Sequence, residues 1–91
     1  MKITFRVHAL KRMFERTVTP DEVSAVLTSG ETIADYPDDS PYPSRLLLGW
    51  SGNRPLHVVA AYNERDNETI VVTVYEPDSA AWNADFRRKK P

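Results

Sequence analysis

The second half of the chain contains three short, mainly apolar runs separated by short turns. The runs are Arg45 to Trp50, Pro55 to Tyr62 and Thr69 to Tyr75, and the turns are Ser51 to Asn53 and Glu64 to Asn67. Short runs of apolar, β-branched and aromatic residues bounded by turn residues are typical of strands, and connections this short join neighbouring strands as hairpins. The sequence therefore predicts an antiparallel meander, around which the rest of the chain must be arranged.

A helix is predicted from Pro20 to about Ser29. Thr19 and Glu22 have the spacing of a capping box, and Pro20 suits the first helical position. Gly30 follows as the expected C-cap.

The N-terminal segment is expected to contain a short strand and a first helix. Ile3 and Phe5 alternate with polar residues, which predicts the strand. Leu10, Met13 and Phe14 recur at helical spacing, which predicts a helix from His8 to Thr17 with these three side chains on its buried side.

The remaining elements complete an α+β fold. Glu31 to Tyr36 is predicted to be a strand, and the proline-rich residues 37–43 a constrained loop. Asp78 or Ser79 is expected to cap a last helical turn or two, in which Trp82 and Phe86 meet at i, i+4. The order β-α-α-β-β-β-β-α predicts a twisted, mainly antiparallel sheet with helices on one face and the other face free.

Size and composition favour a single domain over residues 1–91, with residues 88–91 as a mobile basic tail. The chain has 91 residues, of which 41% are hydrophobic and 27% charged, as in ordinary globular proteins. A second copy in a homodimer, or a partner, would stabilise a domain this small. There is no cysteine, and basic residues interrupt the N-terminal apolar segment, so a cytoplasmic protein without membrane association is expected.

Charge is unevenly distributed although the net charge is −1. Both ends are basic, whereas residues 17–44 contain no Lys or Arg and gather six carboxylates. If the fold brings the two basic ends together, a polyanion can bind there. The alternative is that these residues are simply solvated surface.

The first helix carries the most specific chemical pattern. His8, Arg12 and Arg16 are four residues apart, so each is rotated by only about 40° from the last and the three form a row. Like charges at this spacing are easiest to understand if an anion joins them. The structural alternative is that Arg12 and Arg16 pair with acidic residues after Tyr36.

The other histidine lies in the meander. His57 shares a strand face with Val59 and Ala61, and Tyr75, at the end of the following strand, can approach it if the register permits. Imidazole titrates near neutral pH, which suits proton transfer, although a hydrogen-bonded structural role is the commoner one for a strand histidine.

Several chemistries lack their sequence patterns. There is no HExxH zinc motif, P-loop, dinucleotide fingerprint or GxSxG motif, so no metal and no cofactor is expected. The acidic start of the second predicted helix also argues against a DNA-reading helix-turn-helix.

Four motifs occur in a specific order: HALKRMFERTVTPDEV, GETIADYPDDSPYPSRLLLGW, RPLHVVAAY and TVYEPD. Together they resemble a bacterial family of domains of unknown function, number 4258, over about residues 5 to 86. The resemblance implies a compact RNase-like fold of the RelE and BrnT style, a toxin of a type II toxin-antitoxin system, and a cognate antitoxin protein as partner. The family's histidine and two arginines match His8, Arg12 and Arg16, and its strand histidine and tyrosine match His57 and Tyr75.

The leading hypothesis is a metal-independent endoribonuclease toxin that cleaves single-stranded or ribosome-bound mRNA by attack of the 2′-OH. His8 or His57 would be general base or acid, Arg12 and Arg16 phosphate clamps, and Tyr75 a supporting donor. Further contacts to RNA are expected from Arg45, Arg87 and Arg88 along the backbone and from Tyr42 and Trp50 by stacking on bases.

Two alternatives remain open at this point. One is a non-catalytic binding module that uses the basic face for an acidic partner or nucleic acid. The other is a structural subunit whose acidic middle segment docks a basic antitoxin.

Overall fold

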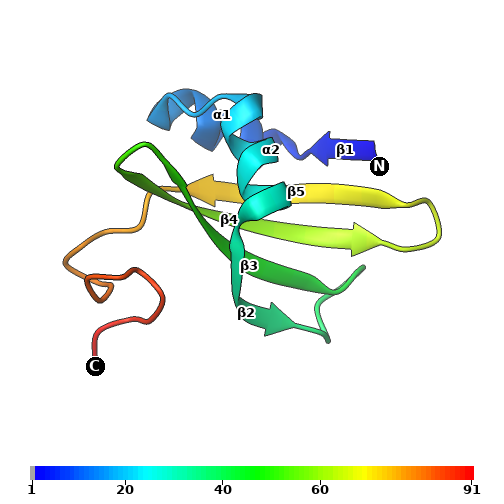
Figure 1. The fold of residues 1–91 in the computed structure, drawn as a ribbon. Helices are drawn as coiled ribbons and strands as arrows, with labels where there is room; N and C mark the ends of the chain where they lie inside the picture. Colours follow the sequence, from blue (N-terminus) through cyan, green and yellow to red (C-terminus); the bar gives the residue numbers. More distant parts are fainter. Residues whose placement is uncertain (1) are drawn as a thin grey trace.

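The computed structural model describes residues 2–91, and its centre is one five-stranded sheet (Figure 1). The strand order across the sheet is β1-β5-β4-β3-β2. The strands are β1 (Lys2–Phe5), β2 (Glu31–Tyr36), β3 (Ser44–Ser51), β4 (Arg54–Asn63) and β5 (Glu68–Tyr75). The protein is therefore an α+β domain with a mixed sheet.

The predicted meander is confirmed. β3, β4 and β5 pair antiparallel in sequence order, and β2 adds to β3 antiparallel. β1 is the exception, because it pairs with β5 in parallel, with Lys2 opposite Glu68 and Phe5 opposite Val71. The first and last strands of the chain thus lie side by side, and β1 and β2 form the two edges of the sheet.

Both helices, α1 (Val7–Arg16) and α2 (Pro20–Ser29), cover the same face of the sheet (Figure 1). The capping box of α2 is present: the Glu22 N–H donates to Thr19 Oγ1 at 3.1 Å, and the Thr19 N–H donates to Glu22 Oε1 at 2.9 Å. α1 begins one residue earlier than expected and ends at Arg16, because Thr17 adopts a left-handed conformation with φ 55°. Neither helix of residues 2–91 has the length and apolar character needed to cross a membrane.

The core lies between the helices and the sheet. Its members are Ala9 and Met13 of α1, Val18 between the helices, Val23 and Val26 of α2, and the strand residues Leu47, Leu56, Val58, Ala60, Val71 and Val74. Leu10, Met13 and Phe14 were predicted to be buried. Only Met13 is buried, and the prediction is wrong for Leu10 and Phe14, which are 48% and 88% exposed. The Arg6 N–H donates to the Val71 carbonyl at 3.0 Å at the start of α1, and the helix sits with Ala9 and Met13 against the sheet.

The predicted last helix does not form. The backbone carbonyl of Asp78 accepts the N–H groups of Ala81 and Trp82 at 3.0 Å, which makes a single turn. Trp82 then bridges Lys89 as an isolated antiparallel pair. Phe86 has a φ of 60°, which is incompatible with a continuing α-helix. Trp82 and Phe86 each pack on the sheet instead of on each other, so tertiary contacts override the local spacing.

The tail, residues 76–91, lies beside the sheet on the side away from the helices (Figure 1). The Asn83 N–H donates to the Arg88 carbonyl and the Lys90 N–H to the Ala81 carbonyl, so the tail folds back on itself. The second face of the sheet, which was predicted to be free, is therefore partly covered.

Candidate functional site

α1 presents two different flanks to solvent. Ala9 and Met13 point to the core. With a rotation of about 100° per residue, His8, Arg12 and Arg16 fall on one side of this buried line, and Val7, Leu10 and Phe14 on the other. All six are exposed. The predicted row is thus accessible along its whole length.

The row has no strong internal counter-charge. Arg12 faces Glu15 one turn away at 3.9 Å, and both side chains are 46% exposed, so this pair contributes little. The alternative of pairing with the acidic segment after Tyr36 is not found, because no other ion pair within residues 2–91 involves Arg12 or Arg16. Residues 2–16 carry five cationic side chains and one carboxylate, so the surface of α1 is suited to an anion.

The C-terminal end of this helix is held by a side chain that the sequence analysis did not single out. Arg54 at the start of β4 donates to the Arg16 carbonyl at 2.9 Å and to the Thr17 carbonyl at 3.1 Å. Its guanidinium also pairs with Glu22 at 2.9 Å. A cation at the C-terminal carbonyls of a helix is electrostatically favourable, so Arg54 fixes the position of the basic row.

Glu22 is the centre of this small network. The Ser51 hydroxyl donates to its carboxylate, the Thr19 N–H and Arg54 also donate to it, and together they lower the pKa of Glu22 from 4.5 to about 2. The sequence signal for Glu22 was its capping-box position. Nothing in the local sequence around Arg54 indicates that it reaches across to two helices.

His57 and Tyr75 are brought together as predicted, since they are register partners in β4 and β5 and Nδ1 lies 3.1 Å from the tyrosine Oη. The His57 side chain is nevertheless fully buried, and its Nε2 lies 2.9 Å from the Phe86 carbonyl oxygen. A carbonyl can only accept, so Nε2 carries the proton and Nδ1 accepts from the tyrosine. Burial lowers the pKa of His57 and raises that of Tyr75, which keeps both neutral.

The tail covers this pair. The Trp82 ring meets the His57 ring edge-to-face at 4.5 Å, and Phe86 meets Trp50 at 5.9 Å. Both nitrogens of His57 are engaged within the fold, so in this structure the imidazole holds the tail onto the sheet. Proton transfer to a substrate would require residues 82–86 to leave the sheet.

The five predicted catalytic residues therefore form two groups. His8, Arg12 and Arg16 lie exposed on the helix side, while His57 is buried with Tyr75 on the opposite sheet face. A small open cleft of about 500 Å³ is lined by Arg16 of the first group and by Phe86, whose carbonyl oxygen contacts His57, but not by His57 or Tyr75 themselves.

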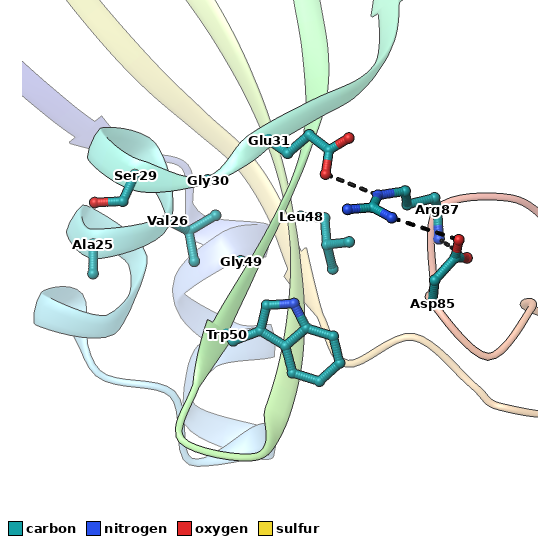
Figure 2. Close-up of a pocket in the computed structure, with 10 residues that line it drawn as sticks. All are labelled: Ala25, Val26, Ser29, Gly30, Glu31, Leu48, Gly49, Trp50, Asp85 and Arg87. Atoms are coloured by element: carbon teal, nitrogen blue, oxygen red, sulfur yellow. Dashed lines mark hydrogen bonds and ion pairs between the residues drawn. The ribbon is translucent and has the colours of Figure 1, made fainter.

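The three predicted RNA-backbone arginines do not lie together either. Arg45 is exposed near the start of β3, at the opposite end from Trp50. Arg87 is bound to Glu31 at 2.9 Å and lies near Asp85 at 3.7 Å (Figure 2). Arg88 is exposed in the tail. Tyr42 is half-buried and its hydroxyl accepts from Asn63, whereas Trp50, the other proposed stacking residue, is 53% exposed.

Within residues 2–91, no group of three or more His, Cys, Asp or Glu side chains is arranged to hold a metal ion.

Together these features define a small α+β domain with an exposed cationic helix and a histidine-anchored tail. The chain belongs to the family described as a domain of unknown function, DUF4258, whose model matches residues 5–76. The matched region contains both histidines, Arg12, Arg16, Arg45, Trp50 and Tyr75. No curated protein and no solved structure matches the chain.

Proposed function

We propose that this protein is an endoribonuclease of the toxin type that binds RNA along the basic flank of α1. The observation that carries the proposal is the exposed row of His8, Arg12 and Arg16, in which no carboxylate closer than 3.9 Å neutralises either arginine. RNA offers a phosphate at each nucleotide, and guanidinium groups bind phosphate in a bidentate geometry.

The reaction that fits these groups is attack of the RNA 2′-OH on the adjacent phosphate. The hydroxyl loses its proton, the 5′-oxygen leaves and takes up a proton, and a 2′,3′-cyclic phosphate remains. Arg12 and Arg16 would stabilise the negative charge of the phosphorane, and His8 would transfer one of the protons. His8 fits this role because its imidazole is the exposed one of the two in the chain.

The wider toxin-antitoxin setting is part of the same proposal. Helices on one sheet face and membership of this family support a fold of the RelE and BrnT style, in which an antitoxin protein would be the partner and bacterial cytosol the place of action. His57 and Tyr75 would join the chemistry only if the tail moves.

RNA binding gives the first test. Single-stranded RNA should bind the wild type with an affinity that falls steeply with salt, and replacing Arg12 or Arg16 by Ala should make the slope of log K against log salt shallower by about 0.7 for each arginine. Arg65→Ala is the matched control, since Arg65 is an exposed arginine in the turn between β4 and β5. If Arg12→Ala and Arg16→Ala bind RNA like Arg65→Ala, the α1 surface is not the RNA site.

Cleavage gives the second test. In EDTA the wild type should produce 2′,3′-cyclic phosphate ends, and His8→Ala should lower the rate by about 10²- to 10⁴-fold with RNA binding unchanged. DNA, which lacks the 2′-OH, should stay intact.

A non-catalytic RNA-binding module is the second candidate. It is favoured by the burial of His57, which leaves His8 as the accessible imidazole on the proposed RNA surface. RNA binding that depends on Arg12 and Arg16, without cleavage and without growth arrest on expression in bacteria, would select this function.

A further inference from the structure

An open cleft of about 620 Å³ lies where the C-terminal end of α2 meets the end of β3 (Figure 2). Trp50 and Leu48 project from β3 on the same side as the tail residues Arg87 and Asp85 (Figure 2). The lining residues that matter for its chemistry are Gly30, Glu31, Gly49, Trp50, Asp85 and Arg87. The size is within the range of sites for small organic molecules.

Trp50 supplies a flat apolar wall. The residue is 53% exposed, and the Phe86 ring meets its indole edge-to-face, with an interplanar angle of 67°. A contact of this kind holds one side of the indole and leaves much of the ring surface in water. An exposed tryptophan face is a stacking platform for planar groups.

The polar wall is rich in hydrogen-bond acceptors. Glu31 and Asp85 flank the guanidinium of Arg87, with Glu31 Oε1 at 2.9 Å from Nε and Asp85 Oδ2 at 3.7 Å from Nη1. Two carboxylates around one cation leave a net negative charge, and the C-terminal end of α2 adds the negative end of a helix dipole. Phosphate is therefore disfavoured here, whereas a ring edge with N–H donors is favoured.

The cleft is also connected to the basic row. Phe86 touches Trp50 on one side and, with Arg16, lines the neighbouring open cleft. An RNA strand with a phosphate bound at Arg16 can thus place a nearby base at Trp50.

We propose that this cleft binds one unstacked base of an RNA strand, stacked on Trp50 with its N–H donors toward Glu31 and Asp85. Guanine fits best among the four bases, because its ring N–H and amino group are adjacent donors. The proposal rests on the proposed RNA function and adds to it a base preference, with Trp50 as the stacking platform and Glu31 and Asp85 as the specificity-determining residues.

Nucleosides test the cleft separately from the α1 row, because they carry no phosphate. Titration of the ¹⁵N-labelled protein with guanosine should shift the amide signals of Gly30 and Gly49 and the indole signal of Trp50. Uridine should bind at least about fivefold more weakly, because it has a single N–H donor between two acceptors. Equal binding of both nucleosides, or shifts confined to other residues, would overturn the proposal.

Variants of Trp50 give the second arm. Trp50→Leu should weaken guanosine binding by about tenfold or more, and Trp50→Phe, which keeps an aromatic face, should retain most of it. Tyr62→Leu is the control, because Tyr62 is an exposed aromatic residue near the far end of β4. If Trp50→Leu binds guanosine like the control and its spectrum stays that of a folded protein, the base site is refuted.

The two proposals fail in distinguishable ways. Guanosine binding should be unchanged in Arg12→Ala and Arg16→Ala. If guanosine does not bind but RNA binding still depends on Arg12 and Arg16, only the base site is refuted. If guanosine binds but RNA binding does not depend on Arg12 and Arg16, the proposed function of α1 is refuted.

Discussion

The network around Glu22 should make the stability of the whole domain depend on pH. The Glu22 carboxylate accepts from the Thr19 N–H in the capping box of α2, and through Arg54 it is connected to the last carbonyls of α1. The pKa of Glu22 is lowered from 4.5 to about 2, first by the Ser51 hydroxyl, then by the Thr19 N–H and Arg54. The folded state therefore favours the ionised carboxylate.

The sign and size follow from this shift. Because the folded-state pKa is below the unfolded one, the contribution is fully present above pH 4.5 and is lost as the pH falls toward 2. Each pKa unit corresponds to 1.36 kcal/mol, which gives an upper value of about 3 kcal/mol. The Glu22 side chain is 21% exposed, so we expect about 2 kcal/mol after solvent screening.

Glu22→Gln is the appropriate perturbation, because glutamine also serves in a capping box but carries no charge. Urea unfolding at pH 7 should show a loss of about 2 kcal/mol, or roughly 10 °C in Tm for a domain of this size. Asp21→Asn removes a neighbouring exposed carboxylate from the same helix turn and should cost only about 0.5 kcal/mol.

The pH profile provides the refutation. As the pH falls from 5 to 2.5, the difference in unfolding free energy between the wild type and Glu22→Gln should shrink, and the two values should converge. Parallel profiles over this range, or a cost at pH 7 no larger than that of Asp21→Asn, would show that the network does not stabilise the fold as argued.

Two further predictions concern the sheet. Because the pKa of His57 is lowered in the folded state, its contribution to stability is full above pH 6.5 and is lost as the pH falls toward the lowered pKa. Urea unfolding of the wild type and of His57→Gln between pH 7.5 and 5 tests this. Unfolding free energies that change in parallel with pH in the two proteins would contradict it. Gly49→Ala should cost about 1–3 kcal/mol, because the added Cβ would lie 2.5 Å from Val26 Cγ2, and a double-mutant cycle with Val26→Ala should give a coupling of at least about 0.5 kcal/mol.

Local signals in the sequence predicted most of the secondary structure. The capping box at Thr19 and Glu22 located α2 to the residue, because both partners of each hydrogen bond lie within one helical turn. The apolar runs of β3, β4 and β5 and the short turns between them predicted the meander. Tyr75 was expected to approach His57 if the register permitted, and the two residues are register partners in the structure.

Contacts between distant segments could not be predicted in this way. The parallel pairing of β1 with β5 joins opposite ends of the chain, and the contacts of Arg54 cross from β4 to both helices. The rotation of α1 about its own axis, which exposes Phe14, depends on the packing of Ala9 and Met13 against the sheet. The tail was predicted as helix because Trp82 and Phe86 have helical spacing, a pattern that does not reveal that each ring has a better partner on the sheet.

The sequence by itself determined that His8, Arg12 and Arg16 form a row, because helical periodicity is a property of neighbouring residues. Tertiary structure alone decided which candidates solvent can reach. It leaves that row exposed and buries His57 beneath Trp82 and the Phe86 carbonyl. The reason is that accessibility depends on what the rest of the chain covers, and the covering tail lies more than twenty residues away from His57 along the sequence.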